Sequence, residues 1–183
     1  MKKLYFRFGT VGCGKSLQLL AVRHNYIAQG KVVSMLKPRI DVRWSETEAV
    51  SRAGISAPVD RILDADTRLD PADFADCSCV LVDEAQFVAP AVIDQLRELT
   101  RVPGVPVICY GLRADFRGEL FAGSERLFAL ADAIEEVKTT CYYCDRKATQ
   151  NQKLTDSGPS IEVGGDELYR PVCYDHFRIG VPQ

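Results

Sequence analysis

The sequence has almost no surplus of charge of either sign. Its 23 basic and 25 acidic residues leave a formal net charge of −2 over 183 residues. A chain this close to neutral creates no polycationic field for a phosphate polymer or an anionic lipid surface. We therefore expect neither a nucleic-acid partner nor a membrane partner.

Long apolar runs are missing as well. No stretch approaches the ~18 apolar residues that span a bilayer, and the basic start is followed by Arg7 and glycines rather than by a secretory apolar segment. These absences predict a soluble, cytoplasmic protein. Seven cysteines form an odd set in a chain that can bury a core without disulfides, so we expect reduced thiols or metal ligands.

Apolar and amphipathic segments alternate along most of the chain. Segments typical of strands occupy residues 3–8, 31–36, 79–82, 105–110 and 133–139. Segments of helical periodicity run from Lys15 to Gly30 and over residues 90–101 and 125–131. This alternation predicts an α/β fold, a parallel sheet flanked by helices. Residues 39–58 are expected to form a long loop.

The composition changes after residue 139, where cysteines appear among glycines, prolines and polar residues. We place a domain boundary there. It separates an α/β core over residues 1–139 from a small lobe over residues 140–183.

A glycine-rich motif joins the first expected strand to the first expected helix. It fits G-x-x-x-x-G-K-[ST] and comprises Gly9, Thr10, Val11, Gly12, Cys13, Gly14, Lys15 and Ser16. In such a phosphate-binding loop (P-loop), glycines let backbone N–H groups turn toward phosphates, the lysine adds a cation, and the hydroxyl ligates Mg²⁺. The flanking strand and helix favour this interpretation over an ordinary glycine-rich turn. Cys13 is interpreted as a small loop residue, the alternative being that its oxidation blocks nucleotide binding.

Two acids, Asp83 and Glu84, come directly after the apolar segment at residues 79–82. In P-loop enzymes an acid at this place holds Mg²⁺, so we assign that role to Asp83 together with Ser16. Glu84 is interpreted as a general base that accepts the proton of an incoming hydroxyl. The alternative is that both acids merely cap the following helix.

Four potential metal ligands form two pairs in the C-terminal segment: Cys141, Cys144, Cys173 and His176. Within each pair two residues separate the ligands, and four protein ligands complete a tetrahedral site with no open position. This pattern predicts structural Zn²⁺. The remaining thiols in or beside apolar strands are expected in the core, at Cys77, Cys79 and Cys109.

Together these motifs resemble the type II thymidine kinases of bacteria and animals. The resemblance extends over nearly the whole chain, and its features occur in the family's order. They are the P-loop at residues 9–16, Asp-Glu-Ala-Gln-Phe at residues 83–87, Tyr-Gly-Leu-Arg-Ala-Asp-Phe-Arg-Gly-Glu-Leu-Phe at residues 110–121, and the two metal-binding pairs with Val-Gly-Gly at residues 163–165 and Tyr169 between them.

The resemblance implies a P-loop NTPase-type core and a ribbon-like zinc lobe, whose "lasso" loop over about residues 150–169 closes over thymidine. It makes Glu84 the catalytic base and Asp83 the Mg²⁺-associated carboxylate. It also places Arg43, in an acid-x-arginine element that begins at Asp41, near the ATP phosphates. Around the nucleoside it places Phe87, Leu112, Phe116, Phe121, Val163, Gly164 and Tyr169. An apolar aromatic slot suits a planar, uncharged base.

The activity implied is transfer of the ATP γ-phosphoryl group to the 5′-hydroxyl of thymidine, giving dTMP in pyrimidine salvage, with deoxyuridine as the secondary substrate. The resemblance further implies a homotetramer and feedback inhibition by dTTP. The chain departs from the family in its P-loop, where methionine is common at the position of Val11 and a larger side chain at that of Gly12. The shorter Val11 is expected to loosen contact with the thymine methyl group.

Three other functions stay open on the residues alone. They are a kinase for another nucleoside, a switch or motor ATPase in which Glu84 positions water, and a zinc-ribbon nucleic-acid adaptor. The sequence has no Asn-Lys-x-Asp motif, which counts against a GTPase switch, and its near-neutral charge disfavours the adaptor.

Overall fold

A parallel sheet of six strands forms the centre of the protein. The structure is a computed structural model that describes residues 2–40, 48–154 and 168–179. The strands stand in the order β5-β2-β6-β7-β1-β8, and every neighbouring pair is parallel. Their bounds are β1 (Leu4–Phe8), β2 (Val33–Pro38), β5 (Arg61–Leu63), β6 (Cys79–Val82), β7 (Val107–Gly111) and β8 (Ala133–Glu136). The predicted α/β fold is confirmed.

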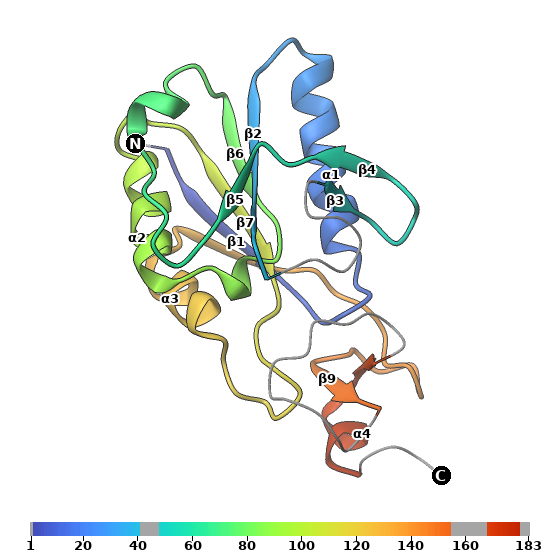
Figure 1. The fold of residues 1–183 in the computed structure, drawn as a ribbon. Helices are drawn as coiled ribbons and strands as arrows, with labels where there is room; N and C mark the ends of the chain where they lie inside the picture. Colours follow the sequence, from blue (N-terminus) through green and yellow to red (C-terminus); the bar gives the residue numbers. More distant parts are fainter. Residues whose placement is uncertain (1, 41–47, 155–167, 180–183) are drawn as a thin grey trace.

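Helices cover both faces of this sheet (Figure 1). α1 (Lys15–Ala28) lies on one face, whereas α2 (Pro90–Leu99) and α3 (Ala122–Leu130) lie on the other. Successive residues of a strand point to opposite faces, so Cys79 of β6 packs on the α1 side and Val80 on the α2 side. A strand buried on both faces is apolar at every position, which explains the continuous apolar run in β6.

The segments that carry the sequence motifs leave the sheet at one edge. Because β1, β6 and β7 are parallel, the residues that follow them emerge together. These residues are the P-loop at residues 9–16, the acidic motif at residues 83–87 and the segment at residues 112–121. β7 stands between β1 and β6, so the P-loop and the acids lie on either side of its end.

The C-terminal lobe adjoins the same edge of the sheet (Figure 1). It contains an antiparallel pair, β9 (Gln150–Lys153) and β10 (Tyr169–Val172), followed by α4 (Tyr174–Ile179). Its apolar cluster consists of Cys141, Val172 and Cys173, with Tyr143, Cys144 and Phe177 packed against them. So small a cluster buries little apolar surface, and lobes of this kind are usually held by a metal or disulfides. The boundary near residue 139 stays a prediction.

The segment predicted as one long loop over residues 39–58 is partly ordered into strands, so that prediction is wrong for its second half. β3 (Glu48–Val50) and β4 (Ser56–Pro58) form an antiparallel hairpin, and buried Ala49 and Ala57 pack with the α1 face. Strands of three residues are too short to show a period of two in the sequence.

Other boundaries differ by a few residues. α3 begins three residues before the predicted start, and the last core strand ends at Glu136 instead of residue 139. The sequence patterns also do not predict α4 or the short 3₁₀ helices η1 (Pro71–Phe74) and η2 (Ala85–Phe87). Within the described ranges, no helix combines the length and apolar character needed to cross a membrane.

Candidate active site

The P-loop follows a path that only glycine can take at several points. Gly12 and Gly14 have φ angles of 69° and 89°, in the left-handed region that a Cβ disfavours. A Cβ at Gly9 would lie 2.5 Å from the carbonyl oxygen of Val137, so a larger residue does not fit there. The loop leads into the N-terminus of α1, where backbone N–H groups and the helix dipole attract anions.

Lys15 and Ser16 are the first residues of α1. Lys15 is 8% exposed, and its Nζ donates a hydrogen bond to the carbonyl oxygen of Thr10 at 2.7 Å. Ser16 Oγ lies 3.4 Å from Oδ1 of Asp83 at the end of β6. The hydroxyl and the carboxylate predicted to hold Mg²⁺ therefore face each other, and oxygen ligands of this kind suit that hard cation.

Glu84 adopts a left-handed backbone conformation with a φ of 48°. No other residue except glycine has a positive φ in the part of the chain that the structure describes. A conformation of this kind costs ~1–3 kcal/mol and persists where the surrounding structure holds it, often at functional sites. The Glu84 N–H donates to Asp83 Oδ1 at 3.0 Å, and the residue is 9% exposed.

The alternative role of these acids as helix caps finds no support in their contacts. η2 follows Glu84 and α2 follows Ala89, and neither N-terminus receives a side-chain capping hydrogen bond. The buried carboxylate pair beside the P-loop, with the strained backbone of Glu84, therefore favours a chemical role over a capping role.

Gln86 links the acidic motif to the segment after β7, a contact that the sequence did not predict. Its Nε2 donates to Glu84 Oε2 at 2.5 Å, and its Oε1 accepts from the N–H of Leu112 at 3.0 Å. Although Gln86 is part of the recognised motif, nothing in the spacing indicates that its amide reaches back two residues. The candidate base and a predicted nucleoside contact are thereby joined through one side chain.

Of the five described residues predicted around the nucleoside, Leu112 is aliphatic and the other four form two aromatic pairs. The rings of Phe87 and Phe121 meet edge to face, with 5.4 Å between centroids. The rings of Phe116 and Tyr169 lie 6.5 Å apart at a tilt of 40°. Tyr169 is buried, whereas the other four side chains are partly exposed and can offer apolar surface to a ligand.

Part of the predicted site lies outside the described residues. This applies to Asp41, Arg43, Val163 and Gly164. The lasso is described only at residues 150–154 and 168–169, so its predicted closure over the nucleoside stays a prediction.

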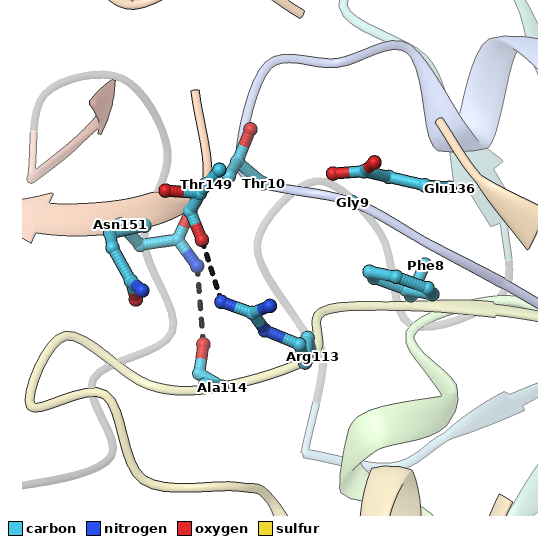
Figure 2. A pocket seen from close by; sticks show the side chains of 9 residues that line it. Phe8, Gly9, Thr10, Arg113, Ala114, Glu136, Thr149 and Asn151 are labelled. Carbon is cyan, nitrogen blue, oxygen red and sulfur yellow. Dashed lines mark hydrogen bonds between the residues drawn. The ribbon is translucent and has the colours of Figure 1, made fainter. Parts of the chain in front are cut away.

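The C-terminal lobe contacts the P-loop through buried Asn151 of β9. Its Oδ1 accepts from the N–H of Val11 at 2.8 Å, and its Nδ2 donates to the carbonyl oxygen of Ala114 at 3.2 Å. Figure 2 shows the second of these bonds. It also shows another hydrogen bond between the core and the lobe, which Arg113 donates to the carbonyl oxygen of Thr149 at 2.9 Å. Sequence reasoning missed this junction because nothing local marks an asparagine as a partner of a distant loop.

The four predicted metal ligands converge. The ligand atoms of Cys141, Cys144, Cys173 and His176 all lie within 4.8 Å of one another. The three sulfur atoms lie 3.4, 3.7 and 3.2 Å from His176 Nδ1, in that order, and the Sγ atoms of Cys144 and Cys173 are 3.9 Å apart. Tetrahedral zinc, with bonds of ~2.3 Å to sulfur and ~2.0 Å to nitrogen, separates its ligand atoms by about 3.5–3.8 Å. The cluster therefore fits one zinc ion.

The environment of this cluster differs from that of the core thiols. Burial raises the pKa of Cys141, but the backbone N–H groups of Cys173 and Tyr143 outweigh it, with other neighbours, and bring that pKa down to about 6. The thiolate that binds metals is thus favoured there. Burial instead raises the pKa of Cys79 to about 12, and it raises that of Cys109 as well. Both are fully buried, as predicted for core residues.

Comparison with known proteins bears directly on the functions left open. A sequence model of the family described as thymidine kinase matches residues 2–177. The chain belongs to the thymidine kinase family. Membership confirms the family expected from the motifs and makes the chain a member of an enzyme family of transferases.

Several members of the thymidine kinase family match along almost their full length. The thymidine kinase of Jannaschia sp. (strain CCS1) is 42% identical over 99% of this chain and 97% of its own. That of Chromobacterium violaceum is 41% identical over 94% and 96% of the two chains, and that of Lactococcus lactis subsp. lactis 39% identical over 97% of each. Among solved structures, the Pif1 helicase from Candida albicans covers 74% of this chain and 36% of its own, with a TM-score of 0.41 and 12% identity.

Proposed function

We propose that this member of the thymidine kinase family transfers the γ-phosphoryl group of ATP to the 5′-hydroxyl of thymidine, giving dTMP for pyrimidine salvage. Deoxyuridine, which lacks only the methyl group of thymine, is the secondary substrate. One observation carries the proposal: the carboxylates that follow β6 lie against the P-loop, with 3.4 Å between Ser16 Oγ and Asp83 Oδ1. A carboxylate pair therefore lies where a triphosphate and its acceptor would meet.

The P-loop is the proposed grip on ATP. Backbone N–H groups of residues 9–16 and the ammonium of Lys15 bind the phosphates, and Arg43 adds a second cation near them. Ser16 and Asp83 would hold the Mg²⁺ ion that accompanies ATP, and this ion supplies neutralisation of the phosphate charge. The position of Lys15 inside the loop, at 2.7 Å from the Thr10 carbonyl oxygen, supports this assignment.

Glu84 is the proposed catalytic base. It accepts the proton of the 5′-hydroxyl as the bond from that oxygen to the γ-phosphorus forms and the bond to the departing ADP oxygen breaks. Burial of Glu84 and its hydrogen bond to Gln86 support a carboxylate held in one orientation for this transfer.

The nucleoside occupies the region between the segment at residues 112–121 and η2 in this proposal. The base lies among aromatic and aliphatic side chains, those of Phe87, Leu112, Phe116, Phe121 and Tyr169, with Val163 and Gly164 of the lasso closing over it. Aromatic surface next to a planar, uncharged ring is favourable and discriminates by shape.

The lobe over residues 140–183 is the proposed second domain, and zinc is its structural metal. The three thiols and one imidazole would occupy all four positions of a tetrahedral ion, so the ion itself has no place for substrate. Its part is to fix the start of β9 and the end of the lasso relative to the core.

Assembly, regulation and location complete the proposal. By likeness to the family we expect a cytoplasmic homotetramer that dTTP inhibits by feedback. Sedimentation equilibrium tests the assembly: a species of single-chain mass at micromolar concentration would contradict it. Inhibition by dTTP is tested by adding it to the thymidine assay, and activity that stays constant at millimolar dTTP would contradict the regulation.

The central experiment compares the parent with Glu84→Gln in phosphorylation of labelled thymidine by Mg²⁺-ATP. We expect kcat to fall about 10²–10⁴-fold, the usual contribution of a general base, while KM for both substrates stays within a few-fold. Glu125→Gln, an exposed carboxamide substitution on α3, is the matched control and should retain kcat. Unchanged turnover by Glu84→Gln would remove Glu84 from the mechanism.

A substrate panel separates the remaining alternatives. Thymidine should be phosphorylated in preference to deoxycytidine and deoxyguanosine. Faster phosphorylation of another nucleoside would point to a different substrate, and ATP turnover at the same rate without any nucleoside would point to an ATPase.

A further inference from the structure

We propose that Gln86 is a positioning residue that holds the carboxylate of Glu84 for catalysis and couples it to the segment at residues 112–121. The proposal rests on the proposed function, in which Glu84 is the base. It assigns to Gln86 no contact with the reacting atoms. Its effect on turnover passes through Glu84 alone.

The contacts of the Gln86 amide fix which way it points. The N–H of Leu112 can only donate, so the atom that faces it at 3.0 Å must be the carbonyl oxygen of the amide. The amide nitrogen then faces Glu84 Oε2 at 2.5 Å, where an ionised carboxylate can only accept. A flipped amide would oppose like groups at both ends, so one orientation satisfies both partners.

The side chain of Gln86 also has no room to move. The residue is 2% exposed, and it lies against Gly111 at the end of β7. A Cβ at Gly111 would lie 2.7 Å from Gln86 Oε1 and 3.0 Å from Gln86 N. Glycine at this position thus lets the glutamine pack directly on the strand backbone, and this packing locks the amide as it reaches Leu112.

The far end of this connection is anchored too. The carbonyl oxygen of Leu112 accepts a hydrogen bond from Ser124 Oγ at 2.6 Å, which ties the segment to α3. Gln86 therefore connects Glu84 to a residue whose own backbone is held on both sides. A shift of Leu112 would be transmitted to the Glu84 carboxylate through the amide.

Glu84 needs such support because its backbone is in the left-handed region, with a φ of 48°. Strained residues keep their conformation only when neighbouring groups hold them. A hydrogen bond to Oε2 restricts rotation of the carboxylate and so fixes where its lone pairs point. Misplacement of a reacting group by about 1 Å can cost on the order of 10²-fold in rate, so this restriction bears on turnover.

The test is a double-mutant cycle between Gln86→Met and Glu84→Gln, measured by steady-state phosphorylation of labelled thymidine. Methionine preserves length and volume but makes neither hydrogen bond. In the parent background we expect Gln86→Met to lower kcat about 10–100-fold with KM for thymidine and ATP changed less than about threefold. In the Glu84→Gln background, where no base remains to be positioned, it should lower kcat less than about twofold.

Gln95→Met is the matched control. Gln95 on α2 also bridges two segments, since its Oε1 accepts from the N–H of Leu69 at 2.9 Å and its Nε2 donates to the carbonyl oxygen of Thr67 at 3.0 Å. Loss of these bonds should lower the melting temperature but leave kcat unchanged. A second variant, Gln86→Glu, keeps an acceptor for the Leu112 N–H and removes the donor to Glu84, so it should lose turnover although the contact with Leu112 is retained.

The outcomes separate this inference from the proposed function. If the parent does not phosphorylate thymidine, or if Glu84→Gln is fully active, the proposed function fails. If both hold but Gln86→Met keeps parental kcat, the positioning role is refuted. An equal loss of kcat from Gln86→Met in both backgrounds would likewise refute it, because a purely structural role acts whether or not the base is present.

Discussion

Replacing Gly123 by alanine probes how closely α3 sits on the segment that carries Glu84. A Cβ at this position would lie 2.6 Å from the carbonyl oxygens of Ala85 and Val88 and 2.8 Å from that of Gln86. All three neighbours are backbone atoms, so the clash is relieved only if α3 or η2 moves. The substitution therefore couples a change on the α2 face of the sheet to the geometry of the candidate base.

The magnitude follows from two opposing contributions. Glycine to alanine within a helix ordinarily stabilises by about 1 kcal/mol. Overpacking of a well-packed site costs about 1–3 kcal/mol, and three short contacts to backbone place this site at the upper end of that range. We expect a net loss of about 1–2 kcal/mol, which lowers the melting temperature by about 2–8 °C in a chain of this size.

Calorimetric melting and thymidine phosphorylation measure the two consequences of Gly123→Ala. We expect kcat to fall more than KM rises, because the short contacts are to η2 and its flanking residues, next to Glu84, and none is to the P-loop. Ala129→Gly, at an exposed position of the same helix, is the control. It should lose about 1 kcal/mol through helix propensity and keep its kcat. A Gly123→Ala protein that melts at or above the parental temperature with unchanged kcat would refute the reasoning.

Two further predictions concern the C-terminal lobe and the stability of the fold at low pH. Chelation of zinc should raise KM for ATP about 3–10-fold, and so should Asn151→Ala in the zinc-loaded protein, because in both cases the Val11 N–H loses its buried acceptor. Steady-state assays measure this change. An unchanged KM for Asn151→Ala would contradict the prediction. The Arg97 side chain and the Leu4 N–H hold the pKa of Asp132 below its ordinary value of 3.8, so its contribution to stability is present above about pH 4 and is lost as pH falls through the lowered pKa. Asp132→Asn should therefore destabilise the protein at pH 7 and less at pH 3, and urea unfolding that gives equal differences at both pH values would count against this linkage.

Much of the fold was readable from local patterns because the central strands are buried on both faces. The apolar run of β6 and the glycine loop after β1 follow from burial and backbone sterics, and both stand where they were predicted. The hairpin of β3 and β4 could not be predicted from the sequence, because three-residue strands gain their stability from packing on α1 and from cross-strand pairing. Such contacts are tertiary and leave no period in the sequence.

The candidate site also contains residues that a local sequence pattern indicates and residues whose role depends on tertiary contacts. Lys15, Asp83 and the four candidate metal ligands could be predicted because their chemistry depends on residue type at a fixed spacing. Gln86 and Asn151 gained no role from the sequence, although both are buried and each satisfies two partners. Their significance lies in which distant segments they join, and that is determined only once the sheet and the lobe have assembled.

The position of β7 between β1 and β6 fixes the distance between the two segments that would bind ATP and carry the base in the proposed reaction. Adjacent strands lie ~4.8 Å apart, so the P-loop that follows β1 and the acidic residues that follow β6 start two such spacings apart, about 10 Å. Hydrogen bonds across a sheet resist stretching in that direction. Any movement that brings donor and acceptor together must therefore come from surface segments and side chains, because the spacing of the strands beneath them stays constant.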